Sequence, residues 1–123
     1  MRNLKEDKDL LLKDLCARLS YDVKLSYRCN HTHVLRAVHK SGLIVINDTA
    51  TDITTTTDVE NIKPYLFPLS SMTEEQQLFY STHLNYMPYY QRVDWFNKHH
   101  LDYRGIIPLG IAIDATGLDI YKS

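Results

Sequence analysis

Cysteine is scarce in this chain, which has two among 123 residues. Two thiols, Cys16 and Cys29, cannot build a disulfide scaffold, and neither belongs to a CxxC pair. Cys16 lies in an apolar helical pattern and Cys29 near the end of an expected strand. We therefore expect both thiols to be reduced, with Cys16 buried as a small hydrophobic side chain.

Long apolar runs are also missing. No window approaches the 18 apolar residues of a membrane-spanning helix, so no membrane partner is expected. The first nine residues, MRNLKEDKD, are charged and lack the apolar stretch of a signal peptide. The expected location is the cytoplasm of a bacterial host.

An excess of charge of one sign is absent as well. The chain has 14 basic and 15 acidic residues and a formal net charge of −1. Broad binding to nucleic acid needs a basic face, so that class of function is excluded, whereas a small pocket for one anion is not. The length favours a single domain over residues 1–123, large enough to bury roughly two-thirds of its unfolded surface.

Apolar spacing in the first half predicts a helix followed by a small sheet. Residues 8–19 place leucines and Cys16 at steps of three and four, with Arg18 in the last turn. Residues 21–28 alternate apolar and polar side chains. Residues 32–40 and 43–47 are further extended runs. Strands joined by such short turns favour an antiparallel meander.

Threonine and proline mark the middle of the chain. Residues 48–61 contain six threonines and are predicted to form a surface loop or an irregular edge strand. Residues 62–77 begin with prolines that keep the backbone extended, so this segment is expected to cross the sheet or core. Ser71 and Thr73 each fit the start of a capping box. The following helix is predicted to run to about Asn85.

The last third combines aromatic residues with a sharp break. Residues 86–100 predict an aromatic hinge and a short helix, and LDYRG ends that helix. The stretch GIAID is a short strand candidate. Together these patterns predict an α+β domain with an N-terminal helix, an antiparallel sheet of three to five strands and two C-terminal helices.

The segment Asn97–Gly105, NKHHLDYRG, concentrates reactive side chains. Adjacent helical residues point about 100° apart, so His99 and His100 cannot both face one metal ion. His99 and Asp102 could approach across the helix end as an oriented base, which needs a third partner for chemistry. In the structural interpretation, the histidines interact with the negative helix end and Gly105 supplies a permissive backbone. Asp102 then bonds turn amides or pairs with Arg104.

A second histidine group lies at the start of the second expected strand. His31 and His33 share a strand face, and His39 lies further along it. Such a pair can hold a metal ion, but only Asp48 is at hand as a further ligand. Exposed histidines on a sheet face are the favoured interpretation, and no metal, cofactor or catalytic set is assigned. Nucleophile-elbow, Walker and dinucleotide-binding motifs are all absent.

Tyrosine is abundant, with nine residues against three phenylalanines. Its ring packs while its hydroxyl seeks a partner, so tyrosine suits half-wet positions. Nine tyrosines indicate either a small domain with many boundary positions or a binding surface rich in stacking groups.

Three stretches resemble a group of small uncharacterised proteins of phages and prophages from Bacteroides-type gut bacteria. They are DLCARL, IKPYLFPLSSMTEEQ and DWFNKHHLDYRGIIPLGIAIDA. They cover about one-third of the chain, and the threonine-rich loop and YMPYY hinge are particular to this sequence. The resemblance brings no known activity. It implies a non-enzymatic accessory protein of phage or mobile-element origin.

Within that class we expect capture of a small anionic ligand, such as a signalling nucleotide of host defence. Aromatic stacking with a few basic contacts to phosphate is the expected mode. The candidate ligand-binding residues are Lys63, Tyr65, Arg92, His99, His100, Asp102, Tyr103 and Arg104. One alternative is an adaptor or inhibitor of a host protein, with Tyr89 and Tyr90 in the interface. Another is a hydrolase that uses His99 or His100 with Asp102. A homo-oligomer is possible in each case.

Overall fold

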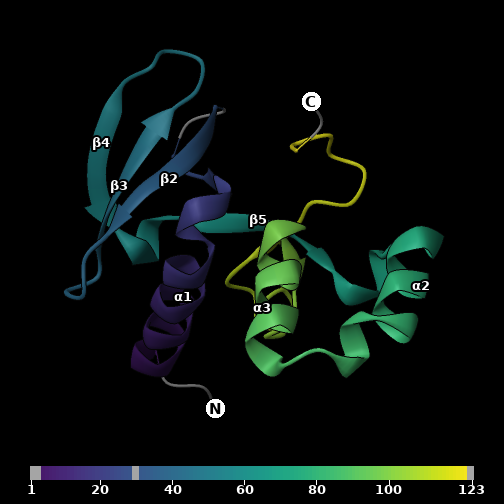
Figure 1. The fold of residues 1–123 in the computed structure, drawn as a ribbon. Helices are drawn as coiled ribbons and strands as arrows, with labels where there is room; N and C mark the ends of the chain where they lie inside the picture. The colour runs from purple at the N-terminus through teal and green to yellow at the C-terminus, as the bar shows by residue number, and fades with distance from the viewer. Residues whose placement is uncertain (1–3, 29–30, 122–123) are drawn as a thin grey trace.

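The computed structural model describes residues 4–28 and 31–121, and it has an α+β fold (Figure 1). Helix α1 (Leu4–Arg18) has acidic residues in its first turn and Arg18 in its last, which suits the helix dipole. Leu11 and Leu15 bury its apolar stripe. Cys16, however, is exposed, so its predicted burial is wrong. Cys29 lies outside the described residues.

The predicted antiparallel meander is confirmed. Strand β1 (Lys24–Ser26) pairs with β2 (Thr32–Val38), and β2 pairs with β3 (Leu43–Asp48), all antiparallel. β1 is shorter than the alternating pattern indicated, because Asp22 adopts a left-handed conformation just before it. A register shift after Leu35 interrupts the β2–β3 ladder.

The threonine-rich segment contains a regular edge strand. All residues of β4 (Thr54–Asp58) pair antiparallel with β3. Of the two predicted alternatives, a loop and an irregular edge strand, the second is nearer to the structure. The 3₁₀ helix η2 (Val59–Asn61) follows, capped by the Asp58 carboxylate, and leads into β5.

Strand β5 (Lys63–Pro68) crosses the molecule, as its prolines predicted. It pairs antiparallel with β1 and parallel with β6 (Leu101–Asp102) and β7 (Ile113–Asp114). Among the described residues the sheet therefore has seven strands, in the order β4-β3-β2-β1-β5-β6 with β7 beside β5. The sheet is larger than the expected antiparallel sheet of three to five strands, because it also includes the parallel strands β6 and β7, which are too short to show alternation.

Helices α2 (Glu74–Thr82) and α3 (Tyr89–Lys98) form an arm on the side away from β4 (Figure 1). Thr73 caps α2 through a capping box with Gln76. α2 ends three residues before the predicted Asn85, and the 3₁₀ helix η4 (Leu84–Tyr86) follows it. Stacking of Phe79 on Trp95, with ring centroids 5.7 Å apart, joins the two helices.

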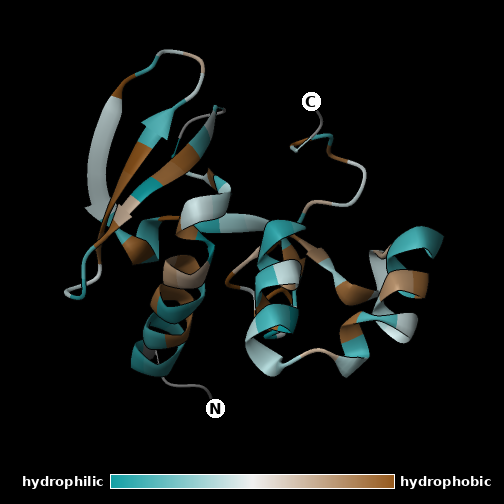
Figure 2. Cartoon of the chain, in the orientation of Figure 1, coloured by the Kyte–Doolittle hydropathy of each residue, from teal (hydrophilic) through white to brown (hydrophobic). Residues whose placement is uncertain are grey.

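The core lies between α1 and the sheet. It is formed by aliphatic side chains from α1, β1, β2, β3, β5 and the chain after β6, and these strands carry the apolar colours of Figure 2. α2 contributes no buried side chain, so the arm lies outside this core. None of the helices in residues 4–28 and 31–121 is long and apolar enough to cross a membrane.

Candidate functional site

The end of α3 is built around His100. α3 ends at Lys98, His99 is the C-cap, and His100 takes a left-handed conformation with φ +57°. The expected permissive residue, Gly105, also has a positive φ but lies in the following turn. With this conformation the chain turns, and β6 begins at the next residue. The carbonyl of His100 accepts a hydrogen bond from the amide of Phe67 at 2.8 Å.

Asp102 holds the turn that follows β6. Its two carboxylate oxygens accept hydrogen bonds from the amides of Ile106 and Ile107, each at 2.9 Å. Of the two predicted partners, the turn amides are therefore the ones found. Within the described residues, no hydrogen bond joins Asp102 to His99 or His100, so the oriented base of the hydrolase alternative is not assembled here.

A buried ionic cluster ties this turn to α1. The fully buried Asp14 accepts hydrogen bonds from Nε of Arg18 at 2.8 Å and from Nε of Arg104 at 3.1 Å. Arg18 also donates to the carbonyl of Leu101 at 2.7 Å. Since two guanidinium groups meet one carboxylate, the cluster keeps excess positive charge. The sequence carried a signal for it, because Asp14 and Arg18 fall on the stripe of Leu11 and Leu15.

Tyr103 packs within this cluster. Its ring stacks on Phe96 at 5.4 Å, with the guanidinium groups of Arg104 and Arg18 at 4.9 and 5.4 Å from its centroid. Arg–aromatic contacts of this kind stabilise the turn. Tyr103 and Arg104, two of the residues predicted to contact a ligand, are thus held by intramolecular partners.

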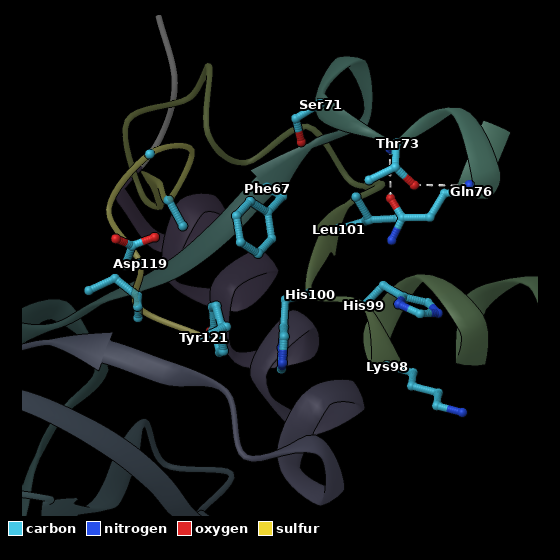
Figure 3. Close-up of a pocket in the computed structure, with 13 residues that line it drawn as sticks. Phe67, Ser71, Thr73, Gln76, Lys98, His99, His100, Leu101, Asp119 and Tyr121 are labelled. Carbon is cyan, nitrogen blue, oxygen red and sulfur yellow. Dashed lines mark hydrogen bonds between the residues drawn. The ribbon is translucent and has the colours of Figure 1, made fainter. Parts of the chain in front are cut away.

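A cleft of about 470 Å³ opens beside the end of α3 (Figure 3). It lies between the start of α2, the end of α3, the end of β5 and the C-terminal segment. Its lining residues are Phe67, Ser71, Thr73, Gln76, Lys98, His99, His100, Leu101, Ala115, Gly117, Asp119, Ile120 and Tyr121. Its size lies within the range of small-molecule sites.

Stacked rings form one wall of the cleft. His100 stacks on Tyr121 with centroids 3.7 Å apart, and Phe67 lies 5.8 Å from Tyr121 (Figure 3). The Tyr121 hydroxyl donates to the carbonyl of Tyr65 at 2.7 Å and accepts from the amide of Lys24 at 2.8 Å. Burial raises the pKa of Tyr121, so its hydroxyl stays protonated. This wall is therefore fixed to β1 and β5.

Polar groups line the opposite side. Thr73 and Gln76, the capping pair of α2, face His99 across the cleft (Figure 3). The pKa of His99 is lowered by burial and by the nearby Lys98. The pKa of His100 is lowered from 6.5 to about 4 by burial, then by the positive charges of Arg18 and Lys24 and by repulsion from His99 when that ring is also protonated. Both rings are thus neutral at pH 7, in positive surroundings.

The remaining predicted ligand residues lie elsewhere. Lys63 lines a separate hollow with Asp7, Lys8 and Ile111. The guanidinium of Arg92 lies 5.6 Å from the ring centroid of Tyr89, on the arm. Of the eight predicted residues, only His99 and His100 line the cleft. Apolar spacing could not have found Phe67 or Tyr121 as their neighbours, because these two residues come from distant segments, whereas Lys98 directly precedes His99 in the sequence.

The second histidine group gathers on Asp48. Nδ1 of His31 lies 2.8 Å from the carboxylate of Asp48, and Nε2 of His33 lies 3.9 Å from it. Burial opposes ionisation of Asp48, but hydrogen bonds from His31 and the amides of Ala50 and Thr51 lower its pKa to about 2. In the described part of the chain, no three His, Cys, Asp or Glu side chains, this group included, are placed so that they could hold a metal ion.

Comparison with protein-family models, curated proteins and solved structures finds no match to this chain. The resemblance to phage proteins therefore stays a prediction. The cleft beside α3 and the arm formed by α2 and α3 are the two features from which a function can be argued.

Proposed function

We propose that this chain is a non-enzymatic protein that binds a small anionic ligand with an aromatic ring, such as a signalling nucleotide, in the cleft beside α3. The observation that carries the proposal is the composition of the cleft. The rings of Phe67 and Tyr121 form one side, and the start of α2 with Lys98 lies on the other. In a phage or mobile element, such binding would withdraw a messenger from host defence.

The charges around the cleft favour an anion. Lys98 lines the cleft. Nη1 of the buried Arg18 has no hydrogen-bond partner among the described residues. Nζ of Lys24 donates to the carbonyl of Ile120, a lining residue, at 2.7 Å. Asp119 is the single carboxylate in the lining. The start of α2 adds the partial positive charge of its helix dipole.

Stacking supplies the second element of recognition. Base–aromatic stacking contributes roughly 1–3 kcal/mol per base. Gln76 uses its side-chain oxygen in the capping box, which leaves its amide NH₂ free to donate to a ligand. We therefore propose that Phe67, Lys98 and Tyr121 contact the ligand, in place of the predicted Tyr103 and Arg104. His99 is kept from the predicted set.

Calorimetry against cyclic dinucleotides, cyclic mononucleotides and ADP-ribose tests the proposal. A binding heat with at least one compound is expected, and chromatography of the released ligand should recover it unchanged. Lys98→Ala should weaken binding roughly tenfold through loss of one charged contact. Lys40→Ala, in the β2–β3 turn, is the matched control and should bind like wild type.

Two results would overturn the proposal. Absence of heat with every compound removes the ligand, and equal affinity of the Lys98→Ala variant places any ligand elsewhere. Recovery of a chemically altered nucleotide would instead favour the hydrolase alternative. In that case, turnover should be lost in His99→Ala or His100→Ala.

A second candidate function rests on the arm formed by α2 and α3. Tyr86, Tyr89 and Tyr90 are 81%, 68% and 70% exposed, and Leu78 on α2 is 64% exposed. Exposed tyrosines grouped on a helical arm are typical of protein interfaces, where aromatic residues are enriched. This observation favours an adaptor or inhibitor that contacts a host protein through the arm.

Capture of a partner by immobilised protein tests this second function. The double change Tyr89→Ser with Tyr90→Ser should abolish capture, because it removes two aromatic anchors. Leu118→Ser alters an exposed apolar residue outside the arm and should preserve capture. If both variants lose capture equally, or if neither variant loses it, the tyrosines of the arm do not bind the partner specifically.

A further inference from the structure

The outer edge of β4 is unpaired in the described part of the chain. β4 is the terminal strand of the sheet, next to β3. The amide of Val59 donates to the carbonyl of Gly42, and the amide of Asp48 donates to the carbonyl of Ile53. In an antiparallel ladder this fixes the peptide groups of odd-numbered residues toward β3. The N–H and C=O groups of Thr54 and Thr56 and the N–H group of Asp58 therefore point outward, whereas the C=O of Asp58, the N-cap of η2, accepts the first bond of that helix.

β4 carries none of the features that usually protect a sheet edge. It has no proline and no lysine, and its ladder with β3 runs without a bulge. Its one charged residue is Asp58, whose carboxylate is already engaged by Lys8 at 3.3 Å. Ile53, just before the strand, is 60% exposed. An edge of this kind can accept a further strand.

The register identifies a second copy of the chain as the fitting partner. When two copies of β4 run antiparallel about a two-fold axis at Thr56, Thr54 faces Asp58 and Thr56 faces itself. The three residues then fall in hydrogen-bonded positions, where the N–H and C=O groups of Thr56 pair with those of Thr56 in the second copy and the N–H of Asp58 donates to the C=O of Thr54. No like charges oppose each other within the strands.

We propose that this chain forms a two-fold dimer in which β4 pairs antiparallel with β4 of a second copy, centred on Thr56. The two sheets then join into one continuous sheet. Because the two-fold axis uses the same edge of both copies, assembly stops at the dimer. β4 lies on the side of the molecule away from α2, α3 and the C-terminal segment, whose residues line the cleft, so the proposal is independent of ligand binding (Figure 1).

Sedimentation velocity over a concentration series tests the dimer with the full chain. Wild-type protein should sediment as a dimer at high concentration. Hydrogen exchange at the amides of Thr56 and Asp58 should slow as concentration rises. Thr56→Lys places two lysines opposite each other and should give a monomer. Thr51→Lys puts the same charge in the exposed turn before β4 and should still dimerise.

A charge-rescue experiment separates loss of pairing from loss of fold. Thr56→Glu alone should also be monomeric, whereas an equimolar mixture of the Thr56→Lys and Thr56→Glu chains should form a heterodimer. A wild-type protein that is monomeric at every concentration would overturn the proposal. So would a Thr56→Lys chain that dimerises like wild type, or a mixture that stays monomeric.

Discussion

His100 should make the stability of this protein sensitive to mild acid. Its half-buried ring stacks on Tyr121, and its Nδ1 has no hydrogen-bond partner in the part of the chain that the structure describes. Burial, together with the charges of Arg18 and Lys24 and repulsion from a protonated His99, lowers its pKa from 6.5 to about 4. The folded protein therefore resists protonation at a pH where the unfolded chain already binds the proton.

The direction of the pH effect follows from this difference. Above pH 6.5 the ring is neutral in both states, and the contribution of His100 to stability is complete. As the pH falls from 6.5 to about 4, the unfolded state gains a proton that the folded state does not, so stability is lost. Two-state linkage gives a loss of about 2 kcal/mol between pH 7 and pH 5, and solvent screening of a half-buried ring reduces it to about 1 kcal/mol.

The assay is urea denaturation at pH 7, 6 and 5 for wild type and for His100→Asn. Asparagine tolerates the left-handed backbone of this position and removes the titrating ring. The variant should be less stable at pH 7, because the contact with Tyr121 is lost. Its free energy of unfolding should fall by about 1 kcal/mol less than that of wild type on going to pH 5.

A parallel decline of the two proteins would refute this reasoning. It would mean that His100 is protonated as easily in the folded protein as in the unfolded chain. His39→Asn, which removes an exposed histidine from the β2–β3 turn, controls for the loss of an imidazole as such.

Further predictions concern the contacts that hold the site, each measured by urea denaturation. Arg18→Met should cost about 3–5 kcal/mol, because it leaves a buried carboxylate without its main partner. Arg104→Met should cost less, since that side chain is partly exposed. Asp102→Asn should cost about 2 kcal/mol, because it sets an NH₂ group against a backbone amide. Thr73→Ala should cost about 1 kcal/mol through loss of the α2 cap, whereas Thr82→Ala near the end of α2 should have little effect.

Local patterns in the sequence predicted the elements better than their assembly. The leucine stripe of α1, the alternation around β1 and the capping box at Thr73 each depend on neighbours within one element. The capping box was confirmed, and Leu11 and Leu15 of the stripe are buried, whereas Cys16 is exposed and β1 is shorter than the alternation indicated. Strand β6 was missed, and β7 was anticipated only as the strand candidate GIAID. A two-residue strand is too short to show a period, and both strands pair with β5, more than thirty residues away in sequence.

Burial of polar residues was the least predictable feature. Cys16 was expected inside and is exposed, whereas Asp14 and Arg18 lie fully buried on the stripe that was taken to be apolar. A charged side chain, whether acidic or basic, is rarely fully buried unless it pairs with a group of opposite charge. The second arginine of the cluster, Arg104, lies 90 residues from Asp14 in sequence. No local pattern contains that partner, so a composition-based interpretation places all three residues at the surface.

This long-range pairing changes how NKHHLDYRG is understood. Its charged and aromatic residues invite a reactive interpretation, yet Asp102 is occupied by two amides and Arg104 by Asp14. Only one face of the His100 ring can be open to a ligand. The ring of Tyr121 covers the other face, with the two ring centroids 3.7 Å apart. His99 differs from these neighbours, since its ring nitrogens have no intramolecular hydrogen bond in the described residues and it lines the cleft. Of the residues predicted in this segment to bind a ligand, His99 is therefore the one whose replacement should weaken binding in the cleft, alongside replacement of Lys98.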